Sequence, residues 1–203
     1  MRTIEVYADV RCPFTHVGLR RVVQRRAELG GGPVLVVHAW PLELVNGEPM
    51  DAGHIATEIE AIRDQVAPDL FTGFEQARFP ASSLPALALT AAAYEVGDAV
   101  GEAVALAVRD AVFEQGLDIA DPTVLDAVAA GHSVGPVTDA HRERVLADWA
   151  DGKERGVIGS PHFIVSTEGF FCPGLDISHD DEGFHIAPDI EGFGAFLDQA
   201  FRP

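Results

Sequence analysis

The first forty residues alternate between strand-like and helix-like patterns, and this order limits the folds open to the chain. Residues 4–10 alternate apolar and polar side chains, as a strand does. Apolar residues then recur every three or four positions over residues 17–26, which predicts a helix. A glycine turn at residues 30–32 introduces a second apolar run at residues 33–40. Strand, helix and strand in this order form a βαβ unit, so we expect the two strands to be parallel.

The middle of the chain is rich in alanine and has helical periodicity. It separates the βαβ unit from the strands that return near the C-terminus. We expect six helices here, at residues 52–66, 70–77, 86–95, 98–113, 122–130 and 138–154. Ser83 is placed to cap the third of them. The apolar stripes of these helices predict a packed core.

Two short strands, at residues 161–165 and 170–172, are separated by a tight turn and predict an antiparallel hairpin. An acidic loop follows, which we expect to be a solvated surface and not a metal site, and an amphipathic helix at residues 190–201 closes the chain. We therefore predict an α/β domain made of residues 1–49 and 151–203. An all-helical insertion domain at residues 50–150 interrupts it.

Cys12 stands where the first helix begins, with Pro13 at the first helical position. Proline is tolerated there because the N–H that it lacks would have no partner within the helix. A thiolate at this point faces unpaired backbone N–H groups and the positive end of the helix dipole. Such an environment can lower a cysteine pKa from about 8.5 to roughly 3.5–7.5. We therefore predict that Cys12 is a nucleophile; the alternative is a small buried structural residue.

Two short stretches resemble the DsbA-like branch of the thioredoxin fold. One is Asp9-Val10-Arg11-Cys12-Pro13-Phe14-Thr15; the other, at residues 156–163, is a glycine-rich turn that ends in Ser160-Pro161 and a strand. The resemblance covers essentially the whole chain in element order. It implies a thioredoxin-like fold (βαβ…ββα) with a helical insertion, and a cis proline at position 161 packed beside Cys12. It also implies a substrate-binding surface formed by Pro13, Phe14, Ser160 and Pro161.

Thr15 departs from the family pattern C-x-x-C, in which a second cysteine resolves the mixed disulfide. Threonine has no sulfur, but its hydroxyl can donate a hydrogen bond to the Cys12 thiolate, or it can be an ordinary helix residue. The resemblance therefore implies a thiol–disulfide oxidoreductase, disulfide isomerase-like, with Cys12 and Thr15 as catalytic residues. Its substrate is a thiol or disulfide, on a small molecule or a protein. Such a site can complete the cycle with an outside thiol such as glutathione, or it can recruit a distant cysteine.

Two other branches share this architecture, and they keep a second function open. The 2-hydroxychromene-2-carboxylate isomerases and kappa-class glutathione transferases are similar, generally with serine at the position of Cys12, and they bind glutathione beside the same cis proline. The alternative is therefore a glutathione-dependent isomerase or transferase. A third hypothesis is a redox-inactive binding protein that keeps the groove for a small ligand.

Secondary candidates lie around Cys12. Asp9 precedes it on the first strand and, if buried, can relay protons to the thiol. Cys172 ends the fourth strand roughly 10 Å away by strand spacing, so a resolving role needs loop movement; packing is the alternative. His16 and His162 flank the expected site and can favour the thiolate or simply pack.

Composition narrows the class of partner. The formal net charge of −18 argues against nucleic acid and anionic membranes. Four arginines at positions 20–26 are expected on the solvated face of the first helix. No apolar stretch approaches the ~20 residues of a membrane span, and residues 1–3 lack the features of a secretory signal, so we expect a cytoplasmic protein. We expect no tightly bound cofactor, and the oligomeric state is open.

Overall fold

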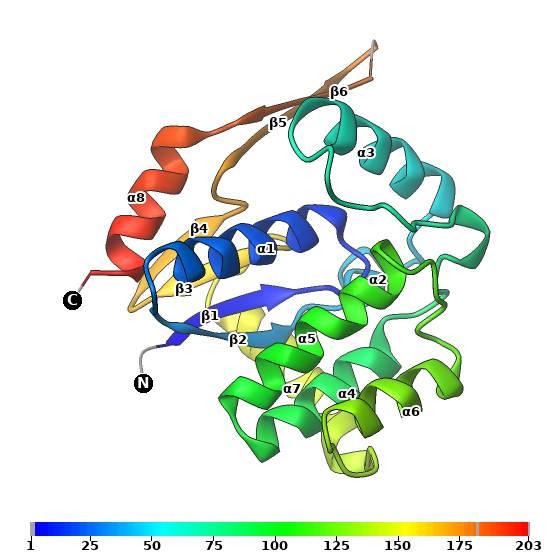
Figure 1. Ribbon diagram of the computed structural model, residues 1–203. Helices are drawn as coiled ribbons and strands as arrows, with labels where there is room; N and C mark the ends of the chain where they lie inside the picture. The colour runs from blue at the N-terminus through cyan, green and yellow to red at the C-terminus, as the bar shows by residue number, and fades with distance from the viewer. Residues whose placement is uncertain (1–2, 182, 203) are drawn as a thin grey trace.

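A mixed four-stranded sheet lies at the centre of the computed structural model, which describes residues 3–181 and 183–202 (Figure 1). The strands are β1 (Thr3–Ala8), β2 (Val34–Ala39), β3 (His162–Val165) and β4 (Glu168–Phe171). Their order in the sheet is β2-β1-β3-β4. β1 pairs with β2 in parallel and with β3 antiparallel, and β3 and β4 form an antiparallel hairpin. The predicted βαβ unit and the predicted hairpin are both confirmed.

The helices follow the predicted order, apart from residues 70–77 and the unpredicted α2. α1 (Pro13–Glu28) connects β1 to β2, and α8 (Ile190–Ala200) ends the described chain. Between β2 and β3 lie α2 (Leu42–Asn46), α3 (Ala52–Gln65), the 3-10 turn η1 (Gln76–Arg78), α4 (Leu84–Val96), α5 (Asp98–Phe113), α6 (Pro122–Gly131) and α7 (Asp139–Glu154). This is a thioredoxin-like fold with a helical insertion. The limits of a separate insertion domain at residues 50–150 stay a prediction.

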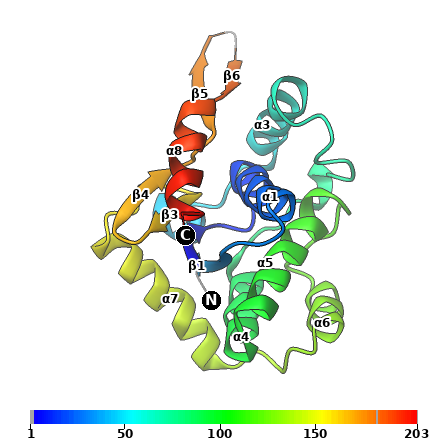
Figure 2. The ribbon, with the colours of Figure 1, turned by 60° about the vertical axis from the view of Figure 1, so that its left-hand side comes forward.

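The sheet is covered on both faces, because the side chains of β1 alternate between two apolar clusters. Ile4, Val6 and Ala8 pack with residues of α1, α5 and α8. Tyr7 points the other way and packs with Trp40 and, at the edge of that cluster, Trp149 of α7. In Figure 2, α1 and α7 accordingly lie on opposite sides of β1. None of the helices described here is both long and apolar enough to cross a membrane.

Residues 70–77 do not form the predicted helix. Phe71 is buried with a left-handed backbone (φ 61°), and the backbone N–H groups of Phe71 and Thr72 donate to the carboxylate of Glu114. These backbone N–H groups therefore donate to a side chain that is distant in sequence. The short turn η1 is the only helical element that forms in this described segment. The short helix α2 was not predicted at all.

The prediction of an acidic loop after β4 is also wrong, because two strands form there. β5 (Leu175–Asp180) and β6 (Gly183–Pro188) form a separate antiparallel hairpin that stands beside α3 (Figure 1). The side chain of Gln65, at the end of α3, donates to the carbonyl of Phe184 at 2.9 Å and accepts from the N–H of Ile186 at 2.8 Å. An amide side chain thus pairs with the hairpin backbone as a neighbouring strand would.

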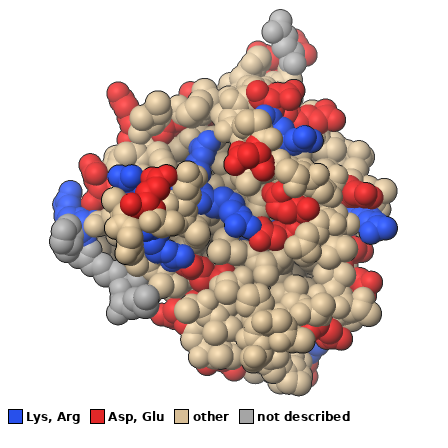
Figure 3. All heavy atoms as spheres, in the orientation of Figure 1, with Lys and Arg blue, Asp and Glu red and all other residues tan. Residues whose placement is uncertain are grey.

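The arginines of α1 are not a free basic surface. Arg20 forms an ion pair with Asp110, Arg26 pairs with Glu102, and Arg21 donates to the carbonyl of Gly174 at 2.9 Å. Figure 3 shows Lys and Arg next to Asp and Glu on this face. The prediction of a solvated face is therefore only partly right, because these side chains tie α1 to α5 and to the loop before β5.

Candidate active site around Cys12

Cys12 lies where β1 ends and α1 begins, as predicted. It is the N-cap residue of α1, its backbone is extended, and Pro13 opens the helix. The peptide bond between Ser160 and Pro161 is cis, which confirms the arrangement implied by the resemblance. The Cys12 thiol donates a hydrogen bond to the carbonyl oxygen of Ser160 at 3.1 Å. The cysteine and the proline turn, 148 residues apart in the chain, thus meet in one site.

The resting thiol of Cys12 is not the low-pKa group that its position at a helix N-terminus predicts. Only 4% of the residue is exposed, and burial raises its pKa to about 11. The hydroxyls of Thr15 and Ser160 act in the opposite direction by favouring the thiolate, but they do not offset burial. At neutral pH the site therefore holds a protonated thiol that acts as a hydrogen-bond donor.

Thr15 and Ser160 form a hydroxyl pair next to the thiol. Their oxygens Oγ1 and Oγ are 2.7 Å apart, and Ser160 Oγ also accepts from the backbone N–H of Asp9 at 2.9 Å. Both side chains are buried. The structure thus brings together Cys12, Thr15 and the proline turn, and it places hydroxyl donors where a charge on the Cys12 sulfur would develop.

Asp9 is fully buried beneath this site, but its carboxylate is occupied by other groups. Oδ1 accepts from the N–H of Arg11 at 2.7 Å, and Oδ2 accepts from the N–H of Leu42 at 2.7 Å and from the hydroxyl of Ser83 at 3.0 Å. Arg109 donates to the Asp9 carbonyl at 3.2 Å. These contacts anchor the end of β1 to the helical region. The relay role of Asp9 stays a prediction, and these contacts give it no support.

Replacement of Ser83 tests how much these contacts of Asp9 stabilise the fold. It was expected to cap α4 with its side chain, but its hydroxyl donates instead to Asp9 and to Glu43. We expect Ser83→Ala to lower the free energy of unfolding by about 1–2 kcal/mol, because it leaves a buried carboxylate oxygen short of a donor. Urea unfolding would measure the loss. The exposed Ser178→Ala should change stability by less than about 0.5 kcal/mol, and equal effects of both variants would contradict the anchoring role.

Cys172 lies directly after β4 and is buried, with its backbone N–H donating to the carbonyl of Pro161 at 2.9 Å. Burial, together with a charge on Cys12, raises the pKa of its thiol to about 12. The two sulfurs therefore interact electrostatically, although both cysteines are free. Cys172 packs in the same apolar cluster as Val17. A resolving role stays a prediction that requires this residue to leave its buried position.

His16 contacts the helical region, and His162 lies near Phe171 of β4. Nε2 of His16 lies 2.8 Å from the Glu114 carboxylate, and its ring packs against Phe71 and Phe113 of the helical region. His162 is buried on β3, and burial lowers its pKa. His16 therefore works as a link between α1 and the insertion, and His162 is held in its neutral form at pH 7.

The surface around Cys12 is partly apolar. Pro13 and Pro161 are buried, and Phe14 is half-buried against the main apolar cluster.

A cavity of about 810 Å³ lies elsewhere, between α4, α6 and α7, with Leu89 and Leu125 among its walls. Cys12 does not line that cavity. Within the described residues, no His, Cys, Asp and Glu side chains gather as metal ligands.

Two ionisable residues near Cys12 were missed in the sequence. Arg109 of α5 is fully buried; burial lowers its pKa to about 10, and its charge interacts with Cys12. Glu58 of α3 interacts with Cys12 through its negative charge. A signal for Glu58 existed, because it follows Ile55 by three residues and precedes Ile62 by four, on the buried stripe of its helix.

Comparisons with known proteins agree with this architecture. Residues 3–179 match the model of a family described as DSBA-like thioredoxin domain. A putative protein disulfide isomerase from Nitrosomonas europaea is similar in structure, with 15% identity and a TM-score of 0.64; the match covers 97% of this chain and 95% of that one. No curated protein sequence matches the chain.

Two further solved structures represent different activities. A 2-hydroxychromene-2-carboxylate isomerase has 16% identity and a TM-score of 0.63, over 83% of this chain and 88% of that one. The cytosolic disulfide reductase DsbM from Pseudomonas aeruginosa, in a structure with GSH, has 20% identity and a TM-score of 0.59, over 97% of each chain. At such identities these likenesses show the fold alone.

Proposed function

Because the chain belongs to the DSBA-like thioredoxin domain family, we propose that it is a thiol–disulfide oxidoreductase with Cys12 as its single attacking sulfur. The observation that carries this proposal is the position of Cys12 Sγ, at the start of α1 and 3.1 Å from the Ser160 carbonyl of the cis proline turn. An extended thiol substrate can pair with the backbone of this turn while its sulfur meets Cys12. Pro13, Phe14 and Pro161 form the apolar part of that surface.

The proposed reaction has two exchange steps. Cys12 attacks one sulfur of a substrate disulfide; the Cys12–substrate bond forms, the original S–S bond breaks, and the released sulfur takes up the Cys12 proton. An outside thiol then attacks the substrate sulfur of this mixed disulfide. A new disulfide between the outside thiol and the substrate forms, Cys12 leaves, and the proton of the outside thiol returns to it. Thr15 cannot take the part of the outside thiol, because it has no sulfur.

Glutathione is the outside thiol that we propose, and the cytoplasm is the compartment. Cytoplasmic thiols are kept reduced by glutathione, so a single-cysteine cycle can run there. DsbM, which shares the fold, is described as a cytosolic disulfide reductase and has been crystallised with GSH. The net charge of −18 is consistent with a thiol or disulfide substrate and not with nucleic acid.

The protonated state of Cys12 favours a second candidate function. A buried thiol with a pKa of about 11 donates a hydrogen bond at neutral pH, as it does to Ser160. Such a donor can hold the sulfur of a bound glutathione without forming a covalent bond to it. The protein would then be a glutathione-dependent isomerase or transferase, in which glutathione and not Cys12 attacks the substrate.

A glutathione-capture experiment tests the proposal. The protein is incubated with oxidised glutathione and its peptides are analysed by mass spectrometry. We expect one glutathione adduct, on Cys12, which excess reduced glutathione removes, and we expect the Cys172→Ser variant to behave in the same way. Bound glutathione without an adduct would favour the isomerase or transferase. Absence of binding would favour a redox-inactive protein.

A further inference from the structure

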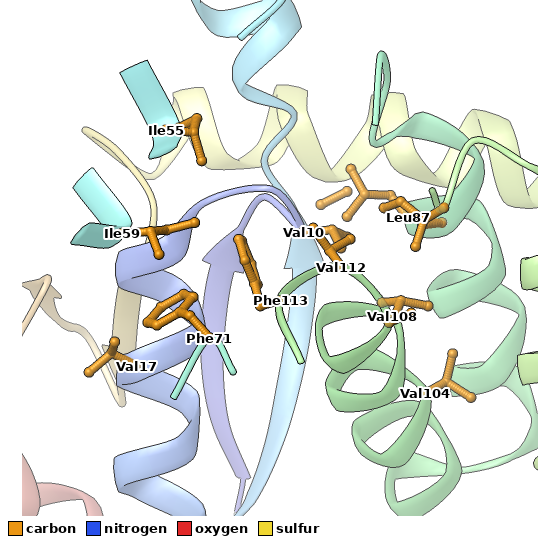
Figure 4. Packing of buried hydrophobic residues seen from close by; sticks show 14 of the residues in the cluster. Val10, Val17, Ile55, Ile59, Phe71, Leu87, Val104, Val108, Val112 and Phe113 are labelled. Atoms are coloured by element: carbon orange, nitrogen blue, oxygen red, sulfur yellow. The ribbon is translucent and has the colours of Figure 1, made fainter. Parts of the chain in front are cut away.

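α6 packs less closely than the helices beside it. Figure 4 shows Leu87 of α4 beside Val108 and Val112 of α5, and all three side chains are buried in the main apolar cluster. None of the ten residues of α6, all of which the structure describes, is buried. The apolar residues at positions 124, 125, 128 and 129 form one stripe along this helix, as in an amphipathic helix, but they are only half-buried. The apolar stripe of α6 is therefore incompletely covered by the rest of the fold.

The cavity of about 810 Å³ adjoins this stripe. Leu125 and Ala129 of α6 line it together with Leu89 of α4 and Leu146 of α7. Leu146 is 51% exposed, so the apolar lining continues to the surface of the molecule. Sites that bind drug-sized molecules typically have volumes of about 300–1,000 Å³ and mostly apolar walls. The cavity is thus large enough to hold a small molecule, and it can be reached from the solvent.

Proline removes hydrogen-bond donors from the helix starts that border the cavity. Pro85 and Pro122 line it at the beginnings of α4 and α6, and neither has an N–H. Pro136, in the loop before α7, is a third proline of the lining. The N–H of Thr123, next to Pro122, already donates to the Asp121 carboxylate at 2.8 Å. Anions usually bind at a helix start through such backbone N–H groups, so this wall is poorly suited to an anionic ligand.

The charged side chains of the cavity do not favour a charged ligand either. Among the lining residues in the described part of the chain, the charged ones are Asp126 and Arg142, whose charges are opposite. Arg142 already donates to the Asp139 carboxylate at 2.6 Å. The net charge of −18 disfavours an anion further, and a cation would meet a guanidinium in the same lining. The lining therefore matches an uncharged molecule.

We propose that this cavity is a second binding site, which takes an uncharged and largely apolar small molecule. The inference goes beyond the proposed thiol chemistry and does not depend on it, because Cys12 does not line the cavity. The bound molecule covers the apolar stripe of α6 and the exposed side of Leu146. Removal of this apolar surface from water, on the protein and on the ligand, drives the binding.

The uncharged fluorophore N-phenyl-1-naphthylamine tests the proposal, because its emission rises in apolar surroundings. We expect the wild-type protein to bind one molecule with saturation. Ala129→Trp should weaken binding by at least about tenfold, since the indole fills part of the cavity from α6. Ala127→Trp is the matched control: this residue is exposed on the same helix and outside the lining, so the affinity should stay within about twofold.

A second variant and a second measurement guard against a change in the fold. Leu146→Gln alters a half-exposed position that the fold should tolerate, and it should weaken probe binding about fivefold through loss of apolar contact. Circular dichroism would confirm that each variant is folded. Alkylation of Cys12 with iodoacetamide should leave the affinity within about twofold. A larger loss would place the probe at the thiol and overturn the second site.

The anionic probe 8-anilinonaphthalene-1-sulfonate tests the class of ligand, because it has the same ring systems and adds one sulfonate. We expect it to bind at least about tenfold more weakly than the uncharged probe. Equal or tighter binding that Ala129→Trp reduces would overturn the uncharged class. Wild-type affinity for the uncharged probe in both Ala129→Trp and Leu146→Gln would overturn the site. An affinity that falls as the protein concentration rises would also overturn it, because a second copy of the chain would then cover the cavity.

Discussion

Replacement of Cys12 by serine should reduce glutathione-dependent disulfide reduction by about 10³-fold or more, because the hydroxyl cannot form the sulfur–sulfur bond on which each step depends. Serine is close to cysteine in size and can keep the hydrogen bond to the Ser160 carbonyl, so the fold should survive. A coupled assay that follows oxidised glutathione during reduction of a small mixed disulfide of glutathione would measure the rate, because Cys12 then captures the glutathione sulfur and reduced glutathione releases it. Circular dichroism would confirm that the variant is folded.

The same variant separates the two candidate functions. Cys172→Ser is the matched control, since it removes the second buried thiol, which the proposed cycle does not use, and should leave the rate within about twofold. If Cys12→Ser instead keeps glutathione-dependent activity, the oxidoreductase proposal is wrong. A hydroxyl can replace a thiol as a hydrogen-bond donor to the sulfur of glutathione, so that result would favour the isomerase or transferase.

The local part of the site could be predicted from the sequence. The placement of Cys12 and Pro13 follows from the change of periodicity between residues 4–10 and 17–26, which is local information. The cis proline turn at Ser160-Pro161 followed only from the resemblance, because no local pattern distinguishes a cis from a trans proline bond. The first prediction therefore rests on local sequence and the second on the family resemblance.

The parts that could not be predicted depend on what packs over the site. The pKa of Cys12 was expected below its ordinary value, and it lies above because the fold buries the thiol. A helix dipole favours a thiolate by a modest amount, whereas loss of water disfavours any charge strongly. The helix predicted at residues 70–77 does not form for a similar reason. Backbone N–H groups of this segment donate to the carboxylate of Glu114, which is distant in sequence.

Thr15→Cys should convert a poor dithiol reductase into a more efficient one, with insulin reduction rising about 100-fold. A cysteine at this position can resolve the mixed disulfide within the molecule, where the effective concentration of a thiol far exceeds that of an outside thiol. Thr15 follows the N-cap by three residues, and its buried side chain already lies beside Cys12, so the two sulfurs would be close. Turbidity during insulin reduction by dithiothreitol would measure the gain.

Thr15→Ser is the control for this gain, because it keeps the hydroxyl that pairs with Ser160 and supplies no sulfur. Its insulin reduction should stay at the wild-type level. Strong wild-type activity that Cys172→Ser abolishes would contradict the single-cysteine cycle and make Cys172 the resolving thiol. If Thr15→Cys gains nothing and the wild-type protein reduces neither insulin nor small disulfides, thiol exchange is not what this site does. The hydrogen bond that Cys12 donates would then point to a bound thiol whose own sulfur reacts.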